Sequence, residues 1–320
     1  MKTDLEVADV LGRVNELLVG AVASSWCGRR AGLDEFVLQG KRLRPAVAID
    51  WALCGRPVDA ERLAHGAAAI ELVHLTTLVH DDIIDESPHR RGVRSTWFSH
   101  GRGRAIVAGD ALFGLAFGLA AKAALDFVGV LTRAVEDVCA GQLQELDDIG
   151  RLDRSAEQVE RIAALKTGSL FAVAAALGVM SSASDFTVDA AWDWGLSLGV
   201  GYQLVNDLKD VDVAGGGTGH DLQAGLLTEP WLYAGGSVEL RKLLDQARTA
   251  PTGADTLEWL WRTPGPRLAS ERISQVLDRV EQLKPCPSFD QKTGVIARFR
   301  QAAAAIVEAN CLVPGKPAGS

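Results

Sequence analysis

Three aspartates follow an apolar run at a spacing that can bind metal ions. Residues 71–85 read ELVHLTTLVHDDIID, with apolar residues at helical intervals. At about 100° per residue, His74, Asp81 and Asp85 fall on one side of that helix, with Thr77 near them. Carboxylates are ligands that Mg²⁺ prefers, together with phosphate oxygens and water. A solvated acidic helix end is the alternative interpretation of this motif alone.

Two arginines follow these aspartates within one short loop, Arg90 and Arg91. Carboxylates at a helix C-terminus oppose the macrodipole and repel each other, so a bound cation would relieve an unfavourable arrangement. Guanidinium groups bind phosphate through paired hydrogen bonds. Acids and arginines together predict a site for a metal-bound polyanion.

A second acidic segment covers residues 199–212, GVGYQLVNDLKDVD. Its polar residues lie near the end of another apolar helix, with Tyr202 one turn below Asn206. The polar set is Gln203, Asn206, Asp207 and Asp210. Two such helices facing each other would form a cavity with a polar mouth and an apolar body. That shape suits a substrate with a diphosphate head and a hydrocarbon tail.

The elements that position these residues are predicted to be helices throughout. Apolar residues recur at three- and four-residue spacing, and alternating strand-like runs are few. We find no linker of distinct composition and no internal repeat. The expectation is one all-α domain over residues 1–313, followed by a disordered tail, 314–320.

Composition excludes several classes of function. The chain of 320 residues is 48% hydrophobic and carries a net charge of −8, so it lacks the basic surface of a nucleic-acid-binding protein. Apolar segments such as 111–124 are predicted to be buried helices, not membrane spans. The N-terminus lacks a secretory signal, which predicts a cytoplasmic protein. Five scattered cysteines predict inert thiols, not a disulfide framework or a zinc site.

Seven motifs, taken in order, resemble those of the trans-isoprenyl diphosphate synthases. They are GKRLRP (40–45), His74 with DDIID (81–85), RRG (90–92), AGDAL (108–112), GQLQEL (141–146), LKTGSLF (165–171) and GYQLVNDLKD (201–210). The resemblance implies an isoprenoid synthase-type helical bundle around a deep central pocket. It further implies a homodimer that uses about three Mg²⁺ ions.

The resemblance also assigns roles residue by residue. Metal ligands would be Asp81, Asp82, Asp85, Asn206, Asp207 and Asp210. Isopentenyl diphosphate would be held by Lys41, Arg44, His74 and Arg91. The allylic diphosphate would be held by Arg90, Lys166 and Gln203, with Thr167 near the reacting carbon. Loss of diphosphate would leave an allylic cation, which isopentenyl diphosphate attacks.

Three positions depart from the family pattern. Asn206 stands where the second motif usually begins with Asp, which weakens one metal site. Gly216 and Leu226 stand where the family usually has lysines. The lost charges partly cancel in sign, so activity is still expected.

Product length is expected to depend on the pocket beneath the first motif. Thr76 and Thr77 are not aromatic plugs, which favours products of C20 or longer. Phe113 or Phe117 could close the pocket deeper down, and Tyr202 would contribute an aromatic wall.

Two other functions remain open on sequence grounds. A terpene cyclase of the same fold would ionise an allylic diphosphate alone, and Asn206-Asp207 loosely resembles its metal motif. Trp97 and Trp231 are the tryptophans most suited to contact carbocations in that case. A non-catalytic subunit of a heteromeric synthase is the second alternative, but it would be expected to lose the first motif.

Overall fold

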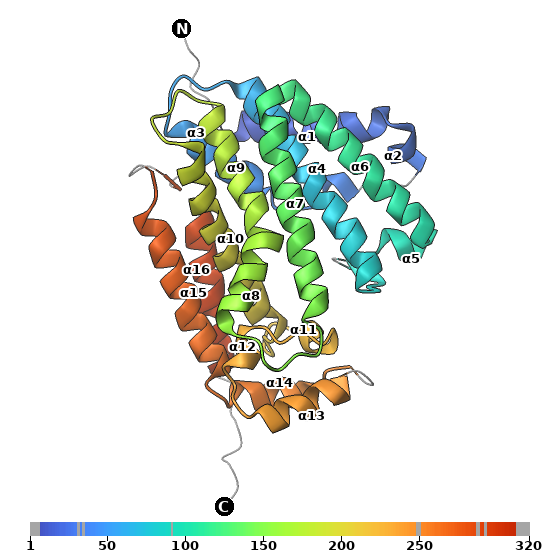
Figure 1. The fold of residues 1–320 in the computed structure, drawn as a ribbon, viewed down its shortest axis with the longest axis vertical. Coiled ribbons are helices and arrows are strands. Elements are labelled where there is room, and N and C mark those ends of the chain that lie inside the picture. Colours follow the sequence, from blue (N-terminus) through green and yellow to red (C-terminus); the bar gives the residue numbers. More distant parts are fainter. Residues whose placement is uncertain are drawn as a thin grey trace, which may run out of the picture. The chain divides into compact units, whose positions relative to one another are not determined.

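The computed structural model describes residues 7–30, 33, 36–90, 92–247, 251–285, 289–290 and 293–311, and their ordered elements are almost all helices (Figure 1). The α-helices are α1 (Val7–Ser24), α2 (Trp26–Arg30), α3 (Leu43–Leu53), α4 (Ala60–Ile84), α5 (Thr96–His100), α6 (Arg102–Ala123), α7 (Leu125–Asp147), α8 (Ala156–Ala163), α9 (Ser169–Met180), α10 (Val188–Asp210), α11 (His220–Gln223), α12 (Glu229–Leu232), α13 (Ser237–Ala247), α14 (Ala254–Trp261), α15 (Gly265–Gln282) and α16 (Val295–Cys311). Two irregular turns, the 3₁₀ turn η1 (Phe36–Leu38) and the π-helical turn η2 (Ala164–Gly168), complete the helical set. The strands β1 (His89–Arg90) and β2 (Val93–Arg94) pair antiparallel, with His89 opposite Arg94. The predicted all-α class is confirmed.

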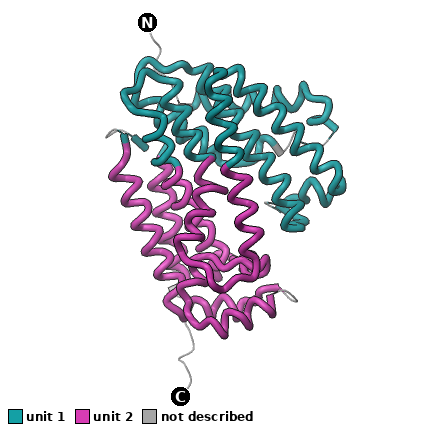
Figure 2. The backbone as a smooth tube through the Cα atoms, in the orientation of Figure 1, with its two compact units in different colours: residues 1–136, 170–195, 285–293 teal, residues 137–169, 196–284, 294–320 magenta. Residues whose placement is uncertain are grey.

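The chain divides into two compact units (Figure 2). Unit 1 comprises residues 1–136, 170–195 and 285–293, and unit 2 comprises 137–169, 196–284 and 294–320. Three of their boundaries fall inside helices, in α7, at the start of α9 and in α10. A single domain over 1–313 stays a prediction, and residues 314–320 lie outside the described part.

Helix α4 forms the core of unit 1, and α6 lies beside it (Figure 1). The helix begins at Asp59, whose side chain accepts a hydrogen bond from the backbone N–H of Arg62. Alanines on all sides make α4 buried around its circumference. At Gly66 a Cβ atom would lie 2.4 Å from a methyl group of Leu177 on α9, so any larger residue there would displace that side chain. Such packing holds the C-terminal aspartates of α4 on a rigid support.

The core of unit 2 brings α10 against α15 and α16. Gly201 lies on α10, where a Cβ atom would come within 2.9 Å of Leu277. The rings of Tyr202 and Phe299 have centroids 5.0 Å apart. A capping box, in which Ser155 and Gln158 bond each other's backbone, starts α8. These contacts position the polar residues of α10 and of the turn η2 that follows α8.

Two helical stretches are long and apolar enough to cross a membrane by length and composition, 102–123 and 156–180. The second is 78% buried over its most apolar window, as expected of a core helix, whereas the first is 39% buried. Helix α6 buries Leu112 and Ala116 but exposes Ile106 and Val107. The predicted burial of this segment therefore applies to one face of α6 only.

Cysteine chemistry differs from the sequence expectation at one residue. Cys54 is disulfide-bonded, so the expectation of five inert thiols is wrong there. Cys27 and Cys139 are free. The spacing of the cysteines gave no sign of this bond, because disulfide geometry depends on distances in the folded chain.

Candidate active site

The last turn of α4 presents the first acidic motif. The backbone N–H of Asp85 donates to the carbonyl oxygen of Asp81 at 2.8 Å, so the two residues share one helical turn as predicted. Asp81 is half-buried and Asp85 is exposed, whereas Asp82 between them is buried. The outer two aspartates therefore form the accessible pair.

Asp82 contacts Arg90. Its Oδ1 atom lies 2.7 Å from Nε of Arg90, the last residue of β1, which follows α4 after a short connection. Burial raises the pKa of Asp82, Asp85 raises it further, and Arg90 opposes both. This ion pair fixes the position of Arg90.

The cations of the basic motif GKRLRP have different environments, one buried with structural partners and the others nearer the surface or an aromatic ring. Arg42 is buried, pairs with Glu71 at 3.2 Å and donates to Asn15 at 2.9 Å, so it holds the start of α3. Lys41 is exposed, and the guanidinium of Arg44 lies 5.1 Å from the ring centroid of Phe171. His74 is half-buried on α4. Arg91 lies outside the described residues.

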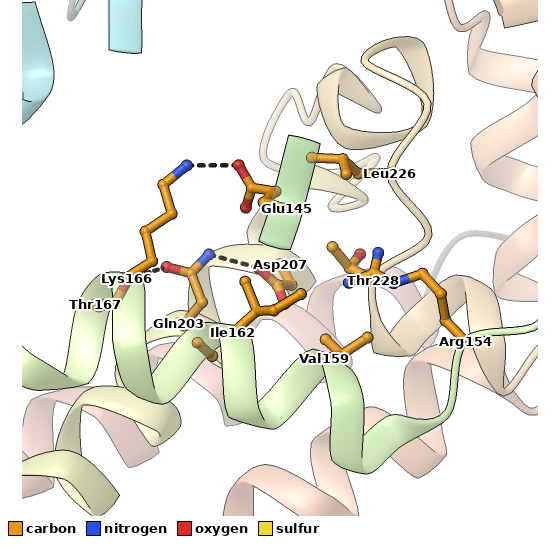
Figure 3. Close-up of a pocket in the computed structure, with 11 residues that line it drawn as sticks. Glu145, Arg154, Val159, Ile162, Lys166, Thr167, Gln203, Asp207, Leu226 and Thr228 are labelled. Atoms are coloured by element: carbon orange, nitrogen blue, oxygen red, sulfur yellow. Dashed lines mark hydrogen bonds and ion pairs between the residues drawn. The ribbon is translucent and has the colours of Figure 1, made fainter. Parts of the chain in front are cut away.

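Unit 2 contains a small pocket that both charged and apolar side chains line (Figure 3). Side chains from α7, α8 and the residue before its cap, η2, α10 and the segment before α12 line it. They are Glu145, Arg154, Val159, Ile162, Ala163, Lys166, Thr167, Gln203, Asp207, Leu226 and Thr228. Four of the predicted site residues, from two motifs, thus meet in one cavity.

A chain of hydrogen bonds crosses this pocket. The hydroxyl of Thr167 donates to Oε1 of Gln203 at 2.8 Å, and Nε2 of Gln203 donates to Oδ1 of Asp207 at 2.8 Å. Lys166 pairs with Glu145 at 2.6 Å. Lys166 and Thr167 belong to the π-helical turn η2, a distortion that often marks functional positions. The chain orients Asp207 and leaves its second oxygen for another partner.

Several carboxyl groups lie near one another around Asp207, and their charges raise the pKa values of Asp207 and Asp221. Burial raises the pKa of Asp207 to about 7, and Asp210 and Glu145 add to the rise, while Gln203 and Arg154 lower it. Burial also raises the pKa of Asp221 well above its usual value, with Asp210 as the next cause. A bound cation would favour the ionised forms of these carboxyls.

Asp210 has a structural task as well. Its carboxylate accepts hydrogen bonds from the backbone N–H of His220 at 2.9 Å and of Asp221 at 3.0 Å, which ties the start of α11 to the end of α10. At Gly217 a Cβ atom would lie 2.6 Å from the Asp210 carbonyl oxygen, so the glycine-rich turn needs glycine there. Asn206 is half-buried one turn earlier.

The donor set suits Mg²⁺ in partnership with a phosphate. Among the residues that the structure describes, no three His, Cys, Asp or Glu side chains gather into a group that could hold a metal ion. Mg²⁺ needs only one or two protein carboxylates when phosphate and water complete its shell. The Asp81/Asp85 pair and the carboxylate surplus around Asp207 each meet that requirement.

The predicted pocket-wall residues do not line the cavity of Figure 3. Thr76 is fully buried and donates to the Leu72 carbonyl oxygen at 3.0 Å, whereas Thr77 is half-buried. Phe113 and Phe117 are half-buried on α6. Tyr202 packs on Phe299 of α16, as described above.

The two tryptophans singled out for carbocation contact differ in environment. Trp231 is fully buried, which makes it a core residue. Trp97 is half-buried, donates to the Ser87 carbonyl oxygen, and has Arg102 5.4 Å from its ring centroid. A cation already occupies one approach to that ring.

Sequence reasoning assigned no role to several residues of the site. Glu145 belongs to the GQLQEL motif, so its pairing with Lys166 had a signal in the sequence. Asp221 follows the glycine-rich turn, and an acidic residue directly after a tight turn was the sequence signal that could have indicated its role. Arg154 had none, because nothing in a lone arginine before a helix predicts burial beside a cavity.

Known proteins match this chain over most of its length. The polyprenyl synthetase family model matches residues 30–259. A nonaprenyl diphosphate synthase of Mycobacterium tuberculosis is 35% identical over 63% of this chain and 62% of its own length. A geranylgeranyl diphosphate synthase of Methanosarcina mazei is 30% identical over 78% of this chain and 81% of its own.

Solved structures agree with the sequence relatives. The crystal structure of a geranylgeranyl pyrophosphate synthase from Lactobacillus brevis superposes with a TM-score of 0.78 and 25% identity, covering 94% of this chain and 97% of that one. The family match spans the first acidic motif, the π-helical turn η2 and the second acidic segment. This chain belongs to the polyprenyl synthetase family.

Proposed function

We propose that this protein is a Mg²⁺-dependent prenyltransferase that joins isopentenyl diphosphate to an allylic diphosphate and releases a linear prenyl diphosphate of C20 or longer. The observation that carries the proposal is the family match over residues 30–259, which includes both acidic segments and all the proposed substrate ligands. The relatives compared above are named for products of this kind.

In this proposal some residues bind metal ions, one positions an arginine, and others bind the diphosphate. Asp81, Asp85, Asp207, Asp210 and Asn206 would hold about three Mg²⁺ ions, which supply positive charge to the leaving diphosphate. Asp82 keeps Arg90 in place by the 2.7 Å ion pair, which supports a positioning role over direct metal ligation. Lys166 and Gln203 bind the allylic diphosphate, and the charge that develops on it is stabilised before the new bond forms.

Isopentenyl diphosphate is held by Lys41, Arg44, His74 and Arg91 in this proposal. The carbon–oxygen bond to the allylic diphosphate breaks first and leaves an allylic cation, which the double bond of isopentenyl diphosphate then attacks. The released diphosphate then accepts the proton that is lost. Thr167 keeps the amide of Gln203 oriented through the 2.8 Å hydrogen bond.

We propose a homodimer in the cytoplasm. Ile106 and Val107 are 48% and 57% exposed on the apolar helix α6, an exposure that a second copy of the chain would relieve. Nucleic acid and an integral membrane segment are not part of the proposal.

A product assay tests this function. Allylic diphosphates from C5 to C20 are incubated with Mg²⁺, each alone and with isopentenyl diphosphate, and both diphosphates and hydrocarbons are measured. Elongated diphosphates should form only with both substrates. A D81N variant should lose this activity, whereas D189N, at an exposed carboxylate in the first turn of α10, should retain it.

Two other outcomes would replace the proposal. Cyclic hydrocarbon from an allylic diphosphate alone would identify a terpene cyclase. The purified protein could also be inactive with every substrate pair and gain activity when a second chain from the source cell is added. That result would identify a subunit of a heteromeric synthase.

A further inference from the structure

Arg154 is a buried cation beside the pocket of unit 2 and has no role in the function proposed above. It lies directly before Ser155, the residue that caps α8. Its side chain is 4% exposed, and it lines the same cavity as Lys166 and Asp207. Burial lowers the pKa of Arg154, while Asp148, Glu145 and Asp207 oppose that change, so burial of this cation has an electrostatic cost.

Two contacts hold the guanidinium from the protein side. Nε lies 3.0 Å from Oδ2 of Asp148, and Nη1 donates to the carbonyl oxygen of Leu227 at 3.1 Å. Within the described chain, no residue accepts a hydrogen bond from Nη2. A guanidinium remains charged in proteins and directs several N–H groups in a fixed plane. Arg154 is thus fixed in position, and the N–H groups of its Nη2 atom can still donate hydrogen bonds to a ligand.

The pocket presents this donor opposite another cation. Figure 3 shows Arg154 and Lys166 entering from opposite sides, with Gln203 and Asp207 between them. Leu226 lines the same pocket and is apolar, at the position where the family resemblance implies a lysine. Arg154 donates to the carbonyl oxygen of Leu227, the residue directly after Leu226. The positive charge of Arg154 therefore lies in the part of the pocket where Leu226 supplies no charge.

We propose that Arg154 binds the diphosphate of the allylic substrate through Nη2 and supplies the positive charge that Leu226 lacks. Charge-assisted hydrogen bonds from arginine to phosphate are among the stronger polar contacts in proteins. The identity of the substrate rests on the function proposed above, but binding of the diphosphate group itself does not.

The first test measures binding of inorganic pyrophosphate in the presence of Mg²⁺ by calorimetry, with thermal unfolding of each variant alongside. R154M should weaken pyrophosphate binding at least tenfold. R151Q removes an exposed arginine of the same loop that also pairs with Asp148, and it should bind within twofold of wild type. Unchanged binding in R154M, or an equal loss in R151Q, would overturn the proposal.

The second test keeps Arg154 and therefore does not depend on the folding of R154M. L226K alone should change pyrophosphate affinity by less than twofold, because Arg154 already supplies the charge. A tenfold gain would show that the pocket lacks this cation and would sink the idea. In the R154M background, L226K should restore most of the lost affinity. Failure of the wild-type protein to elongate any allylic diphosphate would refute the proposed function, while the pyrophosphate series would still decide the role of Arg154.

Discussion

Arg90 is held by Asp82, with Nε of the arginine 2.7 Å from Oδ1 of a carboxylate that is 2% exposed. The middle aspartate of DDIID therefore faces away from the accessible pair Asp81 and Asp85. A buried ion pair is costly to break from one side, because the remaining charge stays buried without its partner. The motif thus combines metal ligands with a residue that positions a cation.

D82N should raise the KM for the allylic diphosphate about tenfold, since hydrogen bonds between charged groups contribute about 1.5–3 kcal/mol. The Mg²⁺ concentration for half-maximal rate should remain near the wild-type value in D82N. In D81N that concentration should rise. Steady-state kinetics at varied Mg²⁺ separates the two effects, and an equal rise in both variants would make Asp82 a metal ligand instead.

Glu229 should make the protein less stable as pH rises. It is fully buried at the start of α12, and neither carboxyl oxygen has a hydrogen-bond partner in the described structure. Burial, then Glu160 and Asp207, raise its pKa from 4.5 to about 8, against the effect of Arg272. The folded protein keeps a proton that the unfolded chain loses, so stability falls between these pKa values by up to about 1.4 kcal/mol per pH unit.

E229Q should remove this dependence. Its unfolding temperature should match wild type near the lower of the two pKa values and exceed it by several degrees near the upper. E157Q changes an exposed glutamate at the start of α8 and should follow the wild-type curve. Parallel curves for E229Q and wild type would mean that Glu229 is ionised in the folded protein.

Substitution of Thr77 should change the product length without unfolding the protein, whereas substitution of Thr76 should also destabilise the fold. Thr76 is fully buried against α6, with its hydroxyl 3.4 Å from the Gly109 carbonyl oxygen, so T76F should destabilise the fold by about 1–3 kcal/mol. Thr77 is half-buried, and T77F should fold and yield shorter prenyl diphosphates. Chromatography of the products checks this, and unchanged chain length in a folded T77F would place the growing chain elsewhere.

The exposed face of α6 should carry the contact between subunits. I106E combined with V107E puts charge on residues that are 48% and 57% exposed, so the monomer should stay folded while the dimer dissociates. Light scattering gives the mass in solution. Substitution of Val238, 83% exposed on α13, by Glu serves as the control. A dimer that persists in the double variant would exclude this face.

The sequence by itself determined the helical class and most members of the site. Helical periodicity gave α4 and α10 their type, and the i, i+4 spacing put Asp81 and Asp85 in one turn. Periodicity suffices there because a helix converts short sequence separations into neighbouring side chains. The ordered motifs likewise singled out Lys166, Gln203 and Asp207, and all three line one pocket.

Only the tertiary structure decided what each charged group contacts. DDIID contains three identical side chains, yet packing buries Asp82 beside Arg90 and leaves Asp85 exposed. Arg42 lies between Lys41 and Arg44 in sequence but is taken into the core by Glu71, 29 residues away. Arg154 reaches its pocket through Leu227, 73 residues further along the chain. Burial and partners at such separations depend on how helices pack, which local residue patterns do not encode.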